Sequence, residues 1–229
     1  MLTLAQLYQQ LRDVELFYEP VGTRELNDRD YEIINSYISG ALDYMYSRFP
    51  LKTQDLILSP LAGKTEYLIS SKFAVSNTAS SETKYIQDGS MKPFTDDWLL
   101  LLDCYDEMGR QIPINNQNRL DGIMTLAYNV IQVPMPLVDR QLELTYQAKH
   151  PKLTGEMDQE LEISPALIPA IAQYIAYRRL AAKSDDKSIQ QSINYYQQFQ
   201  ASVNELLASN MLNTDNRTTT DQICMGGWV

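Results

Sequence analysis

Five acidic side chains in the middle of the sequence come nearest, by type and spacing, to a catalytic or metal site. They are Asp96, Asp97, Asp103, Asp106 and Glu107. Catalysis by such carboxylates needs two of them in different environments flanking a substrate, and a divalent metal needs a comparable cluster. The local sequence favours a loop for the first pair and a hairpin turn for the last pair, because Asp is a common turn residue. We therefore expect structural roles for these carboxylates.

Other reactive side chains are few. The chain has one histidine, His150, and two cysteines, Cys104 and Cys224. These counts exclude a site built on several histidines, a four-cysteine zinc site and a multi-disulfide scaffold. Cys104 lies in an apolar segment typical of a core, and no activating signature accompanies Cys224 or His150. We expect no catalytic residue, no metal site and no cofactor.

Phosphate recognition is also disfavoured. Gly63-Lys64-Thr65 resembles the end of a phosphate-binding loop, but position 58, where such a loop needs glycine, is leucine. Lysine and arginine total 19 against 29 aspartates and glutamates, so the formal net charge is −10. Arg178-Arg179 is the only adjacent basic pair. This balance argues against a protein whose main task is to grip nucleic-acid phosphates.

Helical periodicity marks both ends of the chain. Thr3 and Gln6 fit a capping box, and Asp28 is a good N-cap for a second helix. Further on, Ser164-Pro165 and Ser184-Asp185-Asp186 precede two amphipathic helices, which predicts an antiparallel helical hairpin. The last helix carries apolar residues every three or four positions, which predict a buried face: Ile189, Ile193, Tyr196, Phe199, Val203 and Leu206.

The middle of the chain has the pattern of strands. They are predicted at residues 56–58, 67–69, 98–105, 111–114, 124–133 and 142–146. In the last of these, alternation of apolar and polar residues predicts one buried and one exposed face. Residues 70–97 are polar with little periodicity, and such a long stretch in a compact domain is usually functional or disordered.

These elements predict an α+β fold that is mostly a helical bundle. An N-terminal helix pair and a C-terminal helical hairpin form the bundle, and a small antiparallel β region lies between them. We expect a single domain over residues 1–212, with a β-rich insertion at about 53–147, followed by an extended C-terminal arm, residues 213–229. Tyrosine is frequent, at 15 residues against 5 phenylalanines, and half-buried core positions are its simplest explanation.

The C-terminal arm is the most informative segment for function. Residues 213–221 are polar, and the tip is apolar, with Ile223, Met225, Trp228 and Val229. Tryptophan is a leading interface anchor, so a polar spacer with this tip predicts docking on another subunit. Folding back on its own domain, or plain disorder, are the alternatives.

Targeting signals are not expected. The N-terminus has no basic region followed by an apolar run, so we expect no signal peptide. No apolar stretch approaches the ~20 residues that span a membrane. The two cysteines are therefore expected to be free thiols in a reducing cytoplasm.

The order of elements resembles the head-to-tail adaptor proteins of tailed bacteriophages, the connector subunits below the portal. LAYNVIQVPMPLVDRQLELTYQAKHPKLT is similar to that family's strand, proline-containing turn and second strand. LEISPALIPAIAQYIAYRRLAAKSDD and SIQQSINYYQQFQASVNELL resemble its closing helical hairpin. The resemblance rests on residues 126–207, while residues 70–120 match poorly and suggest a variable insertion.

The resemblance implies a structural virion protein and no enzyme. Identical subunits would form a ring, typically dodecameric, that binds the portal protein, extends the DNA exit channel and provides a platform for tail nozzle or tube proteins. Assembly would take place in the host cytoplasm and leave the ring at the head–tail junction. Genomic DNA would pass through without specific binding, and no membrane would be involved. The C-terminal arm would reach the portal or a neighbouring subunit.

Two other functions remain compatible with the sequence. One is a phage-associated hydrolase that uses the central carboxylates, and the other is an assembly helper that is absent from the finished virion. The adaptor interpretation also suits the charge, because an acidic channel wall repels DNA phosphates.

Overall fold

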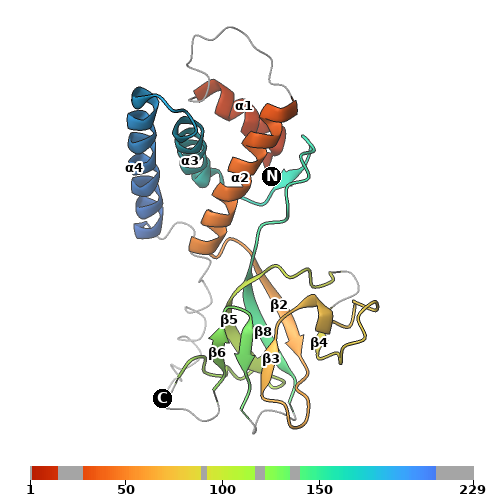
Figure 1. Cartoon of the computed structure of the whole chain (residues 1–229). Coiled ribbons are helices and arrows are strands. Elements are labelled where there is room, and N and C mark those ends of the chain that lie inside the picture. The colour runs from red at the N-terminus through yellow and green to blue at the C-terminus, as the bar shows by residue number, and fades with distance from the viewer. Residues whose placement is uncertain (1, 15–27, 89–91, 117–121, 135–139, 210–229) are drawn as a thin grey trace, which may run out of the picture. The chain divides into compact units, whose positions relative to one another are not determined.

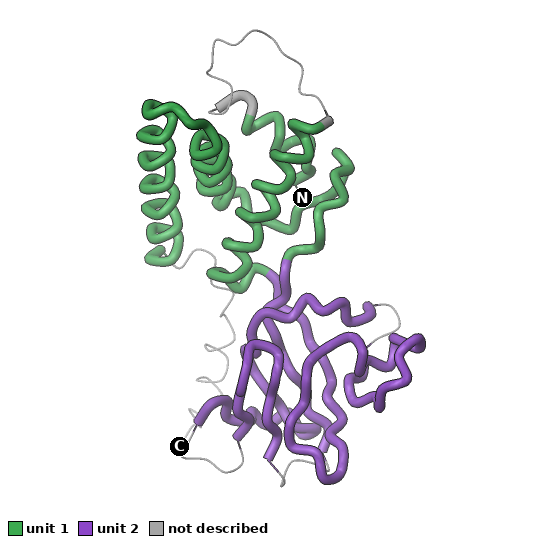
Figure 2. The backbone as a smooth tube through the Cα atoms, viewed as in Figure 1, with its two compact units in different colours: residues 1–51, 150–229 green, residues 52–149 purple. Residues whose placement is uncertain are grey.

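The computed structural model describes residues 2–14, 28–88, 92–116, 122–134 and 140–209. The chain divides into two compact units (Figure 2). Residues 1–51 and 150–229 make the first, here called the helical unit, and residues 52–149 make the second, the β unit. The β unit is thus inserted between the two halves of the helical unit, and the chain passes between the units twice.

The helical unit contains the four α-helices of the described residues (Figure 1). They are α1 (Leu4–Val14), α2 (Asp28–Arg48), α3 (Ile168–Ala181) and α4 (Asp186–Ala208). The predicted capping box at α1 is confirmed, since Thr3 N donates to Gln6 Oε1 at 3.0 Å and Gln6 N donates to Thr3 Oγ1 at 3.3 Å. Each bond satisfies a backbone donor that the helix leaves free.

The C-terminal hairpin is also present. A 3₁₀ turn, Pro165–Leu167, leads into α3, and Asp185 caps α4 by accepting a hydrogen bond from Ser188 N at 2.8 Å. Helix α3 packs against both α2 and α4. Phe199 of α4 lies between two tyrosine rings, 5.1 Å from that of Tyr44 and 5.3 Å from that of Tyr174.

A two-stranded sheet joins the distant halves of the helical unit. Strand β1 (Leu2–Thr3) pairs antiparallel with β9 (Glu160–Leu161), with Leu2 opposite Leu161. The core of this unit draws on all four helices and on β9. Its fully buried residues include Leu4, Leu7, Ile38, Met45, Leu161, Ile171, Ile175 and Phe199.

The β unit contains a four-stranded antiparallel sheet in the order β4-β2-β8-β5. The strands are β2 (Thr53–Leu58), β4 (Ile86–Gln87), β5 (Trp98–Asp106) and β8 (Leu142–Ala148). Central strand β8 pairs Leu144 with Leu56 of β2 on one side and with Cys104 of β5 on the other.

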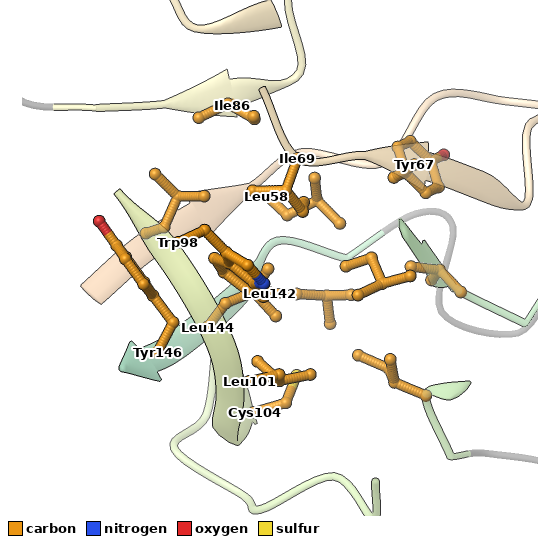
Figure 3. Packing of buried hydrophobic residues seen from close by; sticks show 14 of the residues in the cluster. Leu58, Tyr67, Ile69, Ile86, Trp98, Leu101, Cys104, Leu142, Leu144 and Tyr146 are labelled. Carbon is orange, nitrogen blue, oxygen red and sulfur yellow. The ribbon is translucent and has the colours of Figure 1, made fainter. Parts of the chain in front are cut away.

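A three-stranded antiparallel sheet, β3-β7-β6, completes the unit. Its strands are β3 (Glu66–Leu68), β7 (Val130–Gln132) and β6 (Met124–Ala127). Both sheets contribute to one apolar core, in which Trp98 stacks on Tyr146 at 4.7 Å between ring centroids (Figure 3). The labelled core residues are Leu58, Tyr67, Ile69, Ile86, Trp98, Leu101, Cys104, Leu142, Leu144 and Tyr146.

The prediction of a fold that is mostly a helical bundle is wrong. The described residues contain three antiparallel sheets with nine strands beside the four helices, so the fold is α+β with a full β unit. Many strands are only two to four residues long, and such short runs carry little periodicity. Apart from the local pair β6 and β7, their partners are also distant in the sequence, so pairing has no local signal.

Three strand predictions need correction in detail. Residues 124–133 form a hairpin of β6 and β7 and not one strand. Residues 111–114 contribute only isolated bridges, such as Tyr105 with Gln111. In β8 the polar positions Thr145 and Gln147 are buried as well, both 5% exposed, so this strand is covered on both faces along most of its length.

Candidate functional site

Asp96 and Asp97, just before β5, accept hydrogen bonds from other segments of the β unit. Asp96, at a left-handed φ of 59°, accepts hydrogen bonds from Ser71 N at 2.7 Å and from Ser71 Oγ at 2.5 Å. The Tyr146 hydroxyl lies 3.0 Å from Asp97 Oδ1 and 2.9 Å from Gln54 Oε1. Burial, together with the charge of Asp97, raises the pKa of Tyr146, so this hydroxyl keeps its proton.

Asp106 organises the turn that follows β5. Its Oδ1 accepts hydrogen bonds from the backbone N–H groups of Met108 and Arg110, each at 2.9 Å. The bond from Arg110 is the largest cause that lowers the pKa of the Asp106 carboxyl, and Arg140 lies 3.7 Å from its other oxygen. Gly109 supplies the positive φ of 72° that closes the turn.

The remaining two acidic residues bind neighbouring loops. Asp103 accepts a hydrogen bond from the Gln111 side-chain amide at 2.8 Å, and Glu107 accepts one from Gln141 N at 2.7 Å. All five carboxylates therefore stabilise local structure, as predicted. Across the described ranges, no three His, Cys, Asp or Glu side chains come together in a way that could hold a metal ion.

His150 and Cys104 are core residues in different units. The His150 ring donates from Nδ1 to the Pro151 carbonyl at 2.5 Å and meets the Tyr46 ring edge-on at 5.2 Å. Burial, reinforced by the charges of Asp106 and Asp103, raises the pKa of the Cys104 thiol to about 12. A thiol with this pKa is protonated at neutral pH and is a poor nucleophile. Cys224 lies outside the described residues.

The segment that resembles a phosphate loop is a structural turn. Gly63 has a φ of 76°, and Lys64 N donates to the Leu61 carbonyl at 3.1 Å. The Lys64 ammonium lies 4.3 Å from the centroid of the Tyr85 ring and 5.3 Å from that of Tyr67. Lys64 thus makes cation–π contacts inside the β unit, which is a structural role.

The tyrosine excess has a structural explanation. Several tyrosines are fully buried, and their hydroxyls bind backbone carbonyls: Tyr46 donates to Glu162 and Tyr85 donates to Leu68, the latter at 2.8 Å. The Tyr67 hydroxyl contacts the turn before β3. An apolar ring with one polar tip suits such positions, because it fills the core and satisfies a buried carbonyl.

The arm that was predicted to make contacts is outside the described residues. Ile223, Met225, Trp228 and Val229 all lie in residues 210–229, so their role stays a prediction. In the part that is described, no helix is long and apolar enough to cross a membrane.

Part of the apolar side of α4, which was predicted to be buried, is exposed in the structure. On α4, Phe199 and Val203 are buried as expected, but Ile189, Ile193 and Tyr196 are 43%, 45% and 43% exposed. A signal for this was present in the sequence, because α4 has no charged residue between Lys187 and Glu205. An ordinary solvent-facing helix surface carries charge.

In the described residues, the five central carboxylates, the Cys104 thiol and the His150 ring all have structural contacts. Comparison with known families agrees. Residues 3–222 match the model of the SU10 adaptor protein family, and the chain therefore belongs to that family of phage structural adaptors. A search of curated proteins finds no match. The resemblance to phage adaptors is confirmed at this level, and the protein is a component of the virion.

Proposed function

We propose that this adaptor acts at the head–tail junction as a ring of identical subunits. The ring binds the portal protein, extends the DNA exit channel and offers a platform to the tail nozzle or tube proteins. The observation that carries the proposal is the family match over residues 3–222, which includes both units. In this proposal, residues 1–212 are the adaptor domain and residues 213–229 are the contact arm.

The copy number in finished particles tests this role. Quantitative mass spectrometry of purified virions is expected to find this chain at the same copy number as the portal protein. Absence of the chain from virions would favour an assembly helper and contradict the ring. A few copies per virion, far below the number of portal subunits, would also contradict it.

The arm is proposed to dock through its apolar tip. Ile223, Met225, Trp228 and Val229 form that tip, and tryptophan contributes strongly when it fills a pocket on a partner. Deletion of residues 213–229 is expected to abolish or strongly weaken binding to the portal protein or to the next subunit. Trp228→Ala is the finer test, and Thr219→Ala in the spacer is its control. Unchanged binding after the deletion would refute the arm and leave the adaptor role standing.

The net charge of −10 suits passage of DNA. Carboxylates on a channel wall repel phosphates, so DNA slides without being held. Gel-shift titration of the assembled ring with linear DNA is expected to show no binding at physiological salt. A structure of the ring with a predominantly basic lumen would contradict this part of the proposal.

A further inference from the structure

Helix α4 presents an apolar stripe to solvent. Ile193, Tyr196 and Leu207 follow Ile189 by four, seven and eighteen residues, which places all four on one side of the helix. Each is more than two fifths exposed. Phe199 and Val203, which anchor α4 on its own unit, are buried. The apolar part of α4 is therefore wider than its intramolecular contact requires.

From Ser188 to Asn204, helix α4 carries no charged residue. Between Lys187 and Glu205, its polar side chains are mostly amides: Gln190, Gln191, Asn194, Gln197, Gln198, Gln200 and Asn204. Across the whole chain, 21% of residues are charged. Interface cores are depleted of charged residues and enriched in aromatic ones, so this composition is that of a covered surface. We call these amides and the apolar stripe together the α4 face.

Tyr196, at the centre of the α4 face, is held by contacts within its own unit. Its ring lies 5.0 Å from that of Tyr177 on α3 and 6.3 Å from that of Phe199, and its hydroxyl accepts a hydrogen bond from Gln200 Nε2 at 3.1 Å. A side chain that is fixed before binding loses little conformational entropy when a partner covers it. This makes Tyr196 suited to anchor a contact.

We propose that the α4 face is the surface through which one copy of this chain binds the next. The inference rests on the proposed ring for its setting. Two copies that each carry −10 repel one another, and contact costs least through a surface that has no carboxylate. Side-chain amides also donate hydrogen bonds to acidic groups, so the α4 face accommodates an acidic neighbour.

The geometry of a ring fits this arrangement. In a closed ring, each subunit offers one face to a different face of the next subunit. The α4 face supplies the uncharged side, and a different face of the next copy supplies the other. A cationic partner such as a basic protein would find no carboxylate to pair with over this stretch of α4.

Single charges placed in the α4 face test the proposal in the full-length chain. Ile193→Glu and Tyr196→Glu alter exposed side chains, so the fold is expected to persist, with unchanged circular dichroism. Ile33→Glu is the matched control, because Ile33 is an exposed isoleucine on α2 of the same unit, at 41%. Sedimentation velocity over a concentration series, alone and with purified portal protein, measures self-association.

The expected result is that wild type and Ile33→Glu assemble alike, while each α4 variant assembles roughly tenfold or more weakly. Assembly of the α4 variants at wild-type strength would overturn the inference. A wild-type chain that remains monomeric, both alone and with portal protein, would also overturn it. Self-association through α4 without portal binding would contradict the proposed function and leave this inference intact. Portal binding together with assembly that the α4 substitutions do not weaken would contradict this inference and leave the proposed function intact.

Discussion

At the scale of single residues, the tyrosines decide how the polar and apolar parts of the core fit together. Tyr146 illustrates the principle, because its ring stacks on Trp98 while its hydroxyl lies between Asp97 and Gln54. Most of the side chains that the sequence offers as candidates for catalysis or metal binding likewise have structural roles. Burial suppresses the reactivity of the Cys104 thiol, and the Asp106 carboxylate accepts hydrogen bonds within a turn.

Tyr146→Phe isolates the contribution of one such hydroxyl. The ring packing stays, but Asp97 and Gln54 lose a hydrogen-bond donor in a partly buried cluster. We expect the free energy of unfolding to fall by about 1 kcal/mol. Urea denaturation measures it, with Tyr128→Phe as the control, since Tyr128 is 73% exposed. Equal effects from the two substitutions would contradict the role given to the hydroxyl.

The buried tyrosines also predict loss of stability at high pH. Burial, followed by the influence of Tyr31, raises the pKa of Tyr8 from 10.0 to about 12, and burial raises the pKa of Tyr85 further. The folded state then keeps protons that the unfolded state has released, so stability is complete below pH 10 and falls as pH rises above it. Denaturation curves measured from pH 8 to 12 check this, and Tyr85→Phe should flatten the decline. A stability that is constant above pH 10 would contradict the burial of these hydroxyls.

At the scale of elements, the caps determine where helices begin. Asp185 caps α4, and the hydrogen bond from Ser188 N is the largest cause that lowers the pKa of its carboxyl. Asp185→Ala should therefore destabilise the helical unit at neutral pH, whereas Asp185→Asn, which still caps, should retain most of the stability. Thermal denaturation provides the comparison.

The same cap has a pH dependence with a definite sign. A carboxyl whose pKa is lowered on folding contributes stability that is present above its ordinary pKa of 3.8 and is lost as pH falls through the lower, folded value. The difference between wild type and Asp185→Ala should accordingly shrink as pH falls below 3.8. An undiminished difference well below that pH would show that Asp185 acts in another way.

Elements also show what the sequence could and could not predict. The caps at Thr3 and Asp185 were predictable because a cap and its helix are neighbours in the chain. The strand pairing within the β unit was not predictable, because β2 and β8 pair residues as distant as Thr53 and Gln147. The carboxylates were correctly assigned to structure from turn chemistry alone. The α4 face was missed because helical periodicity identifies an apolar side without saying whether the same chain covers it.

At the scale of the whole molecule, net charge affects the proposed contact between copies. A net charge of −10 opposes self-association, and dissolved salt screens that repulsion over about 8 Å at physiological ionic strength. Assembly of the chain should therefore strengthen as sodium chloride rises from low to physiological concentration. Sedimentation at several salt concentrations measures this. Weakening by salt would mean that attractive ion pairs hold the copies together, which contradicts the uncharged contact proposed for α4.

We propose that this member of the SU10 adaptor protein family forms a ring on the portal. Mixing the purified full-length chain with purified portal protein, followed by native mass measurement and electron microscopy of the product, tests it most directly. We expect a stoichiometric complex with one adaptor subunit per portal subunit, arranged as a ring on one end of the portal. A mixture in which the two proteins remain separate at every concentration and salt condition would contradict it.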